Sequence, residues 1–398
     1  MSIKILDLSD SSYEGSPEAI KFRDFQNALN EAVAFLQDWR MGTAYQILGV
    51  EHKRLMLVKE GEVIATAIVR FYRRLKIFRE AWISHGPVFQ MGASEQDMLS
   101  CLELLRDYLY RNKRVIALQF TPYYNAKTGE KLLPTLEQAG FTNCGQALDM
   151  DTVNHLYIRR LDTGESLEEI ISGYEGNLRR ALPKVEEYGL SCRNLPASEL
   201  EHFFKILDDT ADRKEFFIQD LNYFQAMKRA FGEDCLLALV ELDRAEFIRH
   251  QSEFKAQEES ELKELEGATN RKAEGQRKEA LKRLKAIEKR LAEAEEINCA
   301  KLPLAALFCL KSPGETTTVF GGRYQRFNYT RANSILNHEL LAVAYAEGRK
   351  RFNFYGTLEL AEASEGFGNY EFKKSFGGEI EILMGKFRQA RWPGKVQP

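Results

Sequence analysis

The chain has 398 residues, of which 44% are hydrophobic and 11% aromatic. This composition excludes a disordered chain, and the length predicts about two or three domains with sizeable cores. A formal net charge of −3 excludes a surface that is basic throughout, so any contact with nucleic acid or anionic lipid needs a local basic patch.

The first half of the chain has the pattern of a mixed α/β domain. Helical spacing covers Ala19–Trp39, and two β-rich runs meet at Glu60-Gly61, a typical hairpin turn. Further elements are predicted, in chain order, as a strand at Ala81–Ser84, a helix at Glu95–Tyr110, a strand at Val115–Phe120 and a short helix at Leu132–Ala139. We expect residues 1–160 to form the first domain.

The second half repeats this order. It predicts helices at Glu199–Asp212 and Asp220–Phe231, strands at Cys235–Leu242, Leu304–Leu310 and Thr316–Phe320, a glycine turn at Gly321-Gly322, a helix at Asn333–Ala346 and a strand at Phe352–Tyr355. The shared order of strand, glycine turn, helix, basic turn and strand indicates an internal repeat. We therefore expect a second domain of the same α/β fold from residues 161–243 and 298–398.

The segment between these two parts is unusually rich in charge. Residues 244–296 contain 13 basic and 13 acidic residues, which gives a net charge of zero. Apolar residues spaced by four and three form a heptad seam: Ala280, Leu284, Ile287, Leu291 and Ala294. A polar stretch with two glycines, Gly267–Gly275, predicts the turn. We expect residues 244–297 to form an antiparallel two-helix coiled-coil arm whose charges pair with one another.

Several classes of protein are excluded by what the sequence lacks. It contains no P-loop, G-x-G-x-x-G loop, G-x-S-x-G elbow or H-E-x-x-H motif. No apolar run approaches the length of a membrane span, and residues 1–10 do not resemble a signal peptide. The six cysteines form no C-x-x-C pair, so we expect reduced core thiols in a cytoplasmic protein, with no disulfide, metal site or cofactor.

Two basic stretches could meet phosphates. Arg179, Arg180 and Lys184 lie near a predicted helix start, and the alternative for them is an ordinary solvated helix face. Arg213 lies between two predicted helices, where its guanidinium could bind a diphosphate through two hydrogen bonds. The alternative for Arg213 is a surface ion pair.

Two further stretches combine glycine with a reactive or aromatic side chain. Gly86 and Pro87 follow a predicted strand, where they could line a cleft or form only a turn. In the stretch 370–378, a strand would place Phe372 and one lysine on opposite faces. A lysine such as Lys373 could neutralise a phosphate or a developing oxyanion, and the alternative is a turn with solvated lysines.

Taken together, these stretches resemble the FemABX family, the aminoacyltransferases that build peptidoglycan cross-bridges from aminoacyl-tRNA. The matching pieces are Trp82–Val88, Asn177–Leu190, Phe320–Phe327, Arg349–Gly356 and Asn369–Phe387. The most specific part is Phe352–Gly356, followed by Phe372 and Lys373. The resemblance runs from about Phe35 to Phe387 and includes the arm, which is similar to the arm of some members.

The resemblance implies two tandem acetyltransferase-like (GNAT) domains and assigns roles to named residues. Lys373 matches the family's catalytic lysine, and Arg213 matches less securely an arginine that grips the precursor diphosphate. Implied substrate-binding residues are Arg213, Phe372, Gly86, Pro87 and Tyr355, with Arg179, Arg180 and Lys184 as weaker candidates for contact with tRNA. Departures from the family pattern are His85 for a basic residue, Gln90 for an aspartate, and Thr43 for a lysine, with Arg40 as a nearby substitute.

The implied reaction is transfer of an amino acid from aminoacyl-tRNA to the stem peptide of a peptidoglycan precursor. The acceptor is lipid II or UDP-MurNAc-pentapeptide, and the enzyme visits the inner face of the membrane from the cytoplasm. Homo-oligomers or hetero-oligomers with paralogues are among the implied partners. Two alternatives remain open, namely a related transferase with another acceptor and a non-catalytic paralogue that acts as a binding partner.

Overall fold

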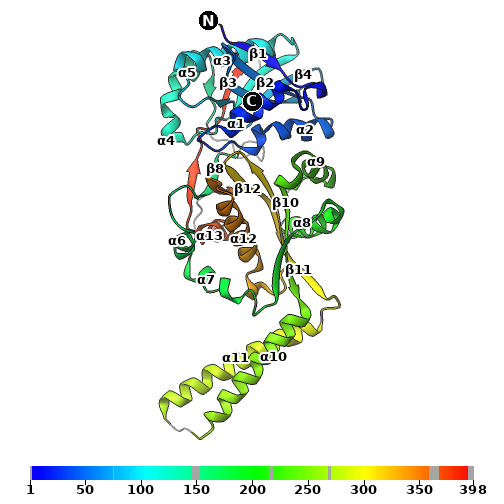
Figure 1. Ribbon diagram of the computed structural model, residues 1–398, viewed down its shortest axis with the longest axis vertical. Coiled ribbons are helices and arrows are strands. Elements are labelled where there is room, and N and C mark those ends of the chain that lie inside the picture. The colour runs from blue at the N-terminus through cyan, green and yellow to red at the C-terminus, as the bar shows by residue number, and fades with distance from the viewer. Residues whose placement is uncertain are drawn as a thin grey trace.

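The computed structural model describes residues 2–74, 76–145, 153–214, 218–267, 270–357 and 367–392. It contains two sheets, each covered by helices, and a two-helix arm that projects from the second sheet (Figure 1). The predicted mixed α/β class is confirmed. No helix among the described residues is long and apolar enough to cross a membrane.

The first sheet has eight strands. Its order is β1 (Lys4–Asp7), β2 (His52–Lys59), β3 (Glu62–Arg74), β4 (Phe78–Ile83), β6 (Val115–Phe120), β15 (Phe387–Ala390) and β7 (Thr142–Asn143), with β5 (Val88–Phe89) paired to β3. Parallel strands β4 and β6 are joined through α3 (Glu95–Tyr110), which begins where the Ser94 side chain accepts a hydrogen bond from the Asp97 N–H. Helices α3 and α5 (Leu133–Gln138) cover one face, α1 (Pro17–Asn27) and α2 (Trp39–Ile47) cover the other, and α4 (Ala126–Gly129) follows β6.

The second sheet has seven strands. Its order is β14 (Glu379–Ile382), β8 (His155–Arg160), β13 (Arg351–Gly356), β12 (Glu315–Arg323), β11 (Lys301–Ser312), β10 (Cys235–Asp243) and β9 (Leu190–Asn194). Parallel strands β12 and β13 are joined through α12 (Ala332–Ala346). One face is covered by α12, α6 (Leu167–Ser172), α7 (Gly176–Arg179) and α13 (Phe367–Lys374), and the other by α8 (Leu200–Lys214) and α9 (Leu221–Phe231). Both sheets thus repeat three antiparallel strands, a helix and a parallel strand.

The two domains exchange strands, which differs from the expected boundaries. Strand β8 follows β7 along the chain but pairs with β13 and β14 in the second sheet. Strand β15 follows β14 but pairs with β6 and β7 in the first sheet. Residues 155–160 and 387–390 therefore join the sheet opposite to the one expected, because a strand's pattern of apolar residues predicts burial but not the pairing partner.

One core runs across the junction between the sheets. It joins aromatic side chains of the first domain, such as Phe22 and Trp39, to Phe203, Phe224 and Phe308 of the second. All five are almost fully buried. Burial of this apolar surface favours one fixed arrangement of the two domains over free rotation about a linker.

The predicted glycine turn at Gly321-Gly322 is instead part of strand β12. A Cβ atom at Gly322 would lie 2.7 Å from the Ile206 carbonyl oxygen and 3.0 Å from Leu207 Cα, both in the backbone of α8. Glycine is therefore required at position 322 because helix α8 packs directly against the strand.

We expect Gly322→Ala to lower the free energy of unfolding by about 1–3 kcal/mol, because α8 must move away from the sheet. Gly275→Ala is the matched control, since Gly275 lies in a helix with open space around its Cα. That change should raise helix stability by up to about 1 kcal/mol. Chemical denaturation measures both, and equal stability of the Gly322→Ala variant and the wild type would contradict this account of the packing.

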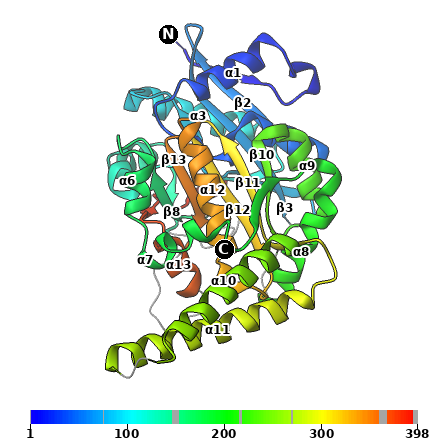
Figure 2. The same cartoon turned by 60° about the horizontal axis from the view of Figure 1, so that its bottom comes forward.

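The charged segment forms the predicted two-helix arm (Figure 2). Helices α10 (Arg244–Glu264) and α11 (Arg271–Glu295) are inserted between antiparallel strands β10 and β11, as expected. Gly275 lies within α11, and residues 268 and 269 of the predicted turn lie outside the described residues. Side chains buried at seven-residue intervals on α11 are Ala273, Ala280, Ile287 and Ala294, whereas coiled-coil packing stays a prediction.

The cysteines only partly match the expectation of core thiols. All six are free, and Cys101, Cys235 and Cys309 are buried. The other three, Cys144, Cys192 and Cys299, are exposed. Among the described residues, no group of three or more histidine, cysteine or carboxylate side chains is arranged to hold a metal ion.

Candidate functional site

The side chain of Lys373 is buried at the carboxyl end of β13. It lies near the end of helix α13, so the predicted strand or strand approach at this position is wrong. Its Nζ donates hydrogen bonds to the carbonyl oxygens of Tyr355 at 3.3 Å and Gly356 at 2.5 Å. With 6% of the residue exposed, burial lowers the pKa of Lys373 to about 7.

The backbone that receives Lys373 has an unusual conformation. Tyr355 has a φ of 61°, in the left-handed region, and its N–H donates a 2.7 Å hydrogen bond to Asn353 Oδ1. The Tyr355 ring packs 6.0 Å from the Phe35 ring of the first domain, measured between centroids. Phe372 is half-buried against Phe376 at 5.5 Å.

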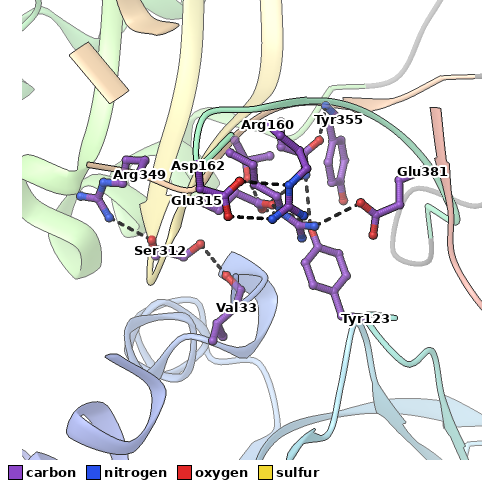
Figure 3. Close-up of polar contacts among 12 residues, drawn as sticks. Val33, Tyr123, Arg160, Asp162, Ser312, Glu315, Arg349, Tyr355 and Glu381 are labelled. Carbon is purple, nitrogen blue, oxygen red and sulfur yellow. Dashed lines mark hydrogen bonds and ion pairs between the residues drawn. The ribbon is translucent and has the colours of Figure 1, made fainter. Parts of the chain in front are cut away.

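A buried polar network lies beside this backbone, at the junction of the domains. We call it the junction network, and its members are Tyr123, Glu315, Arg351, Asn353 and Glu381. Tyr123 belongs to the first domain, whereas the other four belong to strands of the second sheet or its ends. In Figure 3, Glu315 and Glu381 lie to either side of the Tyr123 side chain, and Tyr355 lies above it.

Glu315 is the centre of the junction network. The Tyr123 hydroxyl lies 3.1 Å from each of its carboxylate oxygens. Arg351 Nε donates to Glu315 at 2.5 Å, and Asn353 Nδ2 donates to the Tyr123 hydroxyl at 3.1 Å. Arg351 also reaches Glu381 at 3.3 Å. Each buried charge therefore has an oppositely charged partner, as burial of charge requires.

Burial and neighbouring charges shift the pKa values of three members of the junction network. Burial, with Glu315 nearby, raises the pKa of Tyr123 well above its usual value, so its hydroxyl keeps its proton. Burial alone would lower the pKa of Arg351, but Glu315, Tyr123 and Glu381 raise it. Burial also raises the pKa of Glu381, although Arg351 acts in the opposite direction.

The His85-Gly86-Pro87 turn is buried next to the junction network. The His85 ring lies 4.8 Å from the Tyr123 ring, and Nε2 lies 2.8 Å from the Val153 carbonyl oxygen. Burial lowers the pKa of His85 to about 4, so it is neutral at pH 7 and cannot replace a basic residue. Gly86 faces the Gln37 side chain, and Pro87 borders a small apolar pocket of about 20 Å³. Substrate contact by Gly86 and Pro87 stays a prediction.

Arg213 is exposed near the end of α8, where it lies beside the carboxyl end of β12. Its guanidinium donates hydrogen bonds to the Arg323 carbonyl oxygen at 2.7 Å and to Thr210 Oγ1 at 3.4 Å. The ladder between β12 and β13 covers Glu315–Thr317 and Arg351–Asn353, before either carboxyl end. Arg213 and Lys373 therefore lie at the carboxyl ends of neighbouring parallel strands, the usual place for ligands in α/β sheets.

The weaker candidates for contact with tRNA lie on the surface beside helix α13. Arg179 and Arg180 are exposed on and just after α7, and Lys184 is exposed in the next turn. Arg180 donates a hydrogen bond to Asn177 Oδ1 at 2.6 Å. The same segment touches the Lys373 region, because the Glu175 N–H donates to the Ser375 carbonyl oxygen at 2.9 Å. The structure thus places these basic groups beside α13 but in solvent.

Comparison with known proteins fixes the family of the chain. Residues 18–394 match the model described as the FemAB family. The chain belongs to the FemAB family. Curated relatives include the aminoacyltransferase FemA of Staphylococcus aureus strain MRSA252, which is 26% identical over 350 residues, covering 82% of this chain and 83% of that protein. FemA of strain N315 is 25% identical over the same length.

A solved structure with a similar fold is the crystal structure of FemX. Its TM-score is 0.74 at 19% identity, with 94% of this chain and 96% of that chain covered. The prediction of two tandem acetyltransferase-like domains for this FemAB chain is therefore confirmed. The prediction that the chain is an enzyme of the acyltransferase class is also confirmed.

The departures of this FemAB chain from the family pattern can now be located. Gln90 is exposed and lies just after β5. Thr43 is occupied by hydrogen bonds with Glu14 at 2.9 Å and Arg54 at 2.6 Å. The suggested substitute, Arg40, is held in ion pairs with Asp38 and Asp234, which raise its pKa although burial opposes the shift. Arg40 would have to leave these carboxylates to bind a phosphate.

No member of the junction network is among the site residues predicted from the sequence. Two of its members, Arg351 and Asn353, lie in the stretch that carries the family resemblance. Phe352 and Phe354 face the core formed with α12, so Arg351, Asn353 and Tyr355 must face the other side of the strand. This alternation could have identified Asn353 as a buried polar residue, whereas nothing in the sequence pairs Tyr123 with Glu315.

Asn353→Ala is expected to lower the free energy of unfolding by about 1–3 kcal/mol, because the buried Tyr355 N–H loses its acceptor. Aminoacyl transfer should also decrease, since the Tyr355 carbonyl that receives Lys373 is no longer fixed. Asn30→Ala is the control, because Asn30 is exposed and accepts one hydrogen bond, from Lys350. Denaturation and transfer assays on both variants measure the effect, and unchanged values for Asn353→Ala would refute the role given to Asn353.

Proposed function

We propose that this FemAB enzyme transfers an amino acid from aminoacyl-tRNA to the stem peptide of a peptidoglycan precursor, with lipid II as the acceptor. The observation that carries the proposal is Lys373, an amine buried at the end of β13 and held by two carbonyl oxygens. The curated relatives are aminoacyltransferases, and they match 82% of this chain.

The proposed step is aminolysis of an ester. The acceptor amine attacks the aminoacyl carbonyl carbon, an amide bond forms and the ester C–O bond breaks. The tRNA ribose oxygen leaves and takes up a proton, while the attacking amine loses one. The tetrahedral intermediate carries an oxyanion, and a protonated Lys373 directs positive charge at this position. Because the ester is already activated, positioning of the two substrates supplies much of the remaining rate.

Arg213 is the proposed contact for the precursor diphosphate. Its guanidinium is exposed, and the groups that it contacts in the described part of the chain are neutral oxygens. A phosphate can replace these contacts without breaking an ion pair. Phe372, Tyr355, Gly86 and Pro87 stay the proposed substrate-binding residues, and Arg179, Arg180 and Lys184 the weaker candidates for contact with tRNA.

The test uses purified enzyme, tRNA charged with a labelled amino acid, and purified lipid II or UDP-MurNAc-pentapeptide. Labelled product on lipid II supports the proposal, and product only on the UDP-linked precursor corrects the acceptor. Product only on an unrelated soluble amine would establish a transferase with another acceptor. No product with any charged tRNA would favour a non-catalytic paralogue, which the departures at Gln90 and Thr43 keep as the second candidate.

A further inference from the structure

Helix α11 carries a row of exposed basic side chains along the arm. Its members are Arg271, Lys278, Lys282, Lys285 and Lys289, and we call them the arm row. They are spaced by seven, four, three and four residues, so they lie along one side of the helix. The row extends over about 27 Å, at 1.5 Å per residue.

The arm row lies on the side of α11 that faces away from α10. At 100° per residue, its positions are about 140° to 200° around the helix from the buried seam of Ala273, Ala280 and Ile287. The acidic residues of the same stretch, such as Glu279 and Glu288, occupy the flanks. Glu274 is exposed at about 120° from the seam, beside the gap between Arg271 and Lys278. The positive charge is therefore continuous from Lys278 to Lys289.

The expected pairing of charges within the arm occurs on the two flanks of α11, beside the buried seam. Arg283 pairs with Glu258 at 2.6 Å and Glu261 at 3.0 Å, and Lys255 pairs with Glu288 at 3.2 Å. Within the described part of the chain, no carboxylate forms an ion pair with a member of the arm row. The zero net charge of the arm therefore combines the five positive charges of the arm row with a net charge of −5 on the other residues of 244–296.

We propose that the arm row is the contact by which this protein rests on an anionic lipid surface. A straight helix lying on a flat surface touches it along its whole length, so all five basic side chains reach phosphate groups together. A helix that crosses a rod-shaped nucleic acid touches it near one point and engages fewer of them. The charge is complementary to anionic headgroups, and each basic residue near such a surface raises binding about fivefold.

The contact is electrostatic, without insertion into the bilayer. The apolar seam of α11 is covered by α10, and Leu281 is the exposed large apolar side chain among the described residues of α11. An inserted helix needs a broad apolar face. The binding should therefore decrease steeply as salt concentration rises.

The inference deepens the proposed function, since a lipid-linked acceptor lies in such a surface, but its test requires no turnover. The full-length protein is sedimented with vesicles of equimolar phosphatidylglycerol and phosphatidylcholine, and with vesicles of phosphatidylcholine alone. The test variant replaces Lys278, Lys282, Lys285 and Lys289 with glutamine, which has a helix propensity close to that of lysine. The matched control replaces four exposed lysines of the globular domains with glutamine: Lys113, Lys127, Lys131 and Lys205.

We expect the affinity of the test variant for the anionic vesicles to be at least about 100-fold lower than that of the wild type. The affinity of the control variant should change little. Circular dichroism shows whether both variants keep their helices. Equal binding by the test variant and the wild type, or no binding by the wild type, would overturn the proposal. A test variant that still binds vesicles but no longer binds uncharged tRNA would instead make the row an RNA contact. Normal vesicle binding by Lys373→Met separates this inference from the catalytic proposal.

Discussion

Lys373→Met is expected to reduce aminoacyl transfer by at least about 100-fold while leaving the fold intact. The factor is typical for removal of a group that stabilises an oxyanion. Methionine is an unbranched, uncharged side chain, so it can occupy a position that is 6% exposed. Transfer of labelled amino acid to the precursor measures the rate, and thermal unfolding confirms the fold. A folded variant that transfers at the wild-type rate would remove Lys373 from the mechanism.

The pH dependence gives a second readout of the same residue. Because burial lowers the pKa of Lys373 to about 7, its positive charge is lost as the pH rises through 7 rather than through 10.5. The transfer rate should therefore have a falling limb near pH 7. Lys373→Arg keeps a positive charge at all these pH values and should lack that limb, even if its rate is low.

The lowered pKa of Lys373 also makes the free energy of unfolding depend on pH. The unfolded chain, with a normal lysine, binds more protons than the folded chain between about pH 7 and 10.5. The lysine's contribution to the free energy of unfolding should therefore become more favourable as the pH rises through this window. At or below pH 7, Lys373→Met should be at least as stable as the wild type.

Glu315→Ala is expected to cost about 3–5 kcal/mol of stability, the largest structural effect that we predict. The change leaves Arg351 as a buried cation with Glu381 as its remaining carboxylate partner, at 3.3 Å. It also removes the acceptor for the Tyr123 hydroxyl, and with it a polar link between the domains. Urea denaturation with spectroscopic detection measures the loss.

The matched control is Glu296→Ala, which breaks the exposed ion pair between Glu296 and Arg326. The side chains of this pair are 73% and 44% exposed, against 1% and 7% for Glu315 and Arg351. Its loss should cost less than about 1 kcal/mol. If both variants lost the same free energy of unfolding, burial would not strengthen the pair between Glu315 and Arg351.

Much of the fold could be predicted because its elements have strong local patterns. The helix at Glu95–Tyr110 and the strand at Val115–Phe120 were predicted with the bounds that the structure has. The arm lies between the strands predicted at Cys235–Leu242 and Leu304–Leu310, where the internal repeat places it. The pairing of β8 and β15 could not be predicted, since partner choice depends on contacts far apart in sequence.

The site was predictable only where one short stretch contains it. The local motif identifies Lys373, but the alternation of Phe372 with a lysine suggests a strand where the structure has helix α13. The helix conformation instead brings Lys373 Nζ to the carbonyls at the end of β13. Tyr123 and Glu315 are 192 residues apart, and no local pattern reports their contact.

Strands β8 and β15 each pair with the sheet opposite to the one expected, and this limits how the chain can be shortened to a single domain. A first domain produced alone would lack β15, leaving the β6 edge open and β7 without the strand with which it pairs. An open edge of this kind attracts other chains and promotes aggregation. The two sheets repeat one order of elements, yet each is completed by a strand that the expected domain boundaries assign to the other domain. Loss of either half should remove the whole protein rather than leave a smaller enzyme.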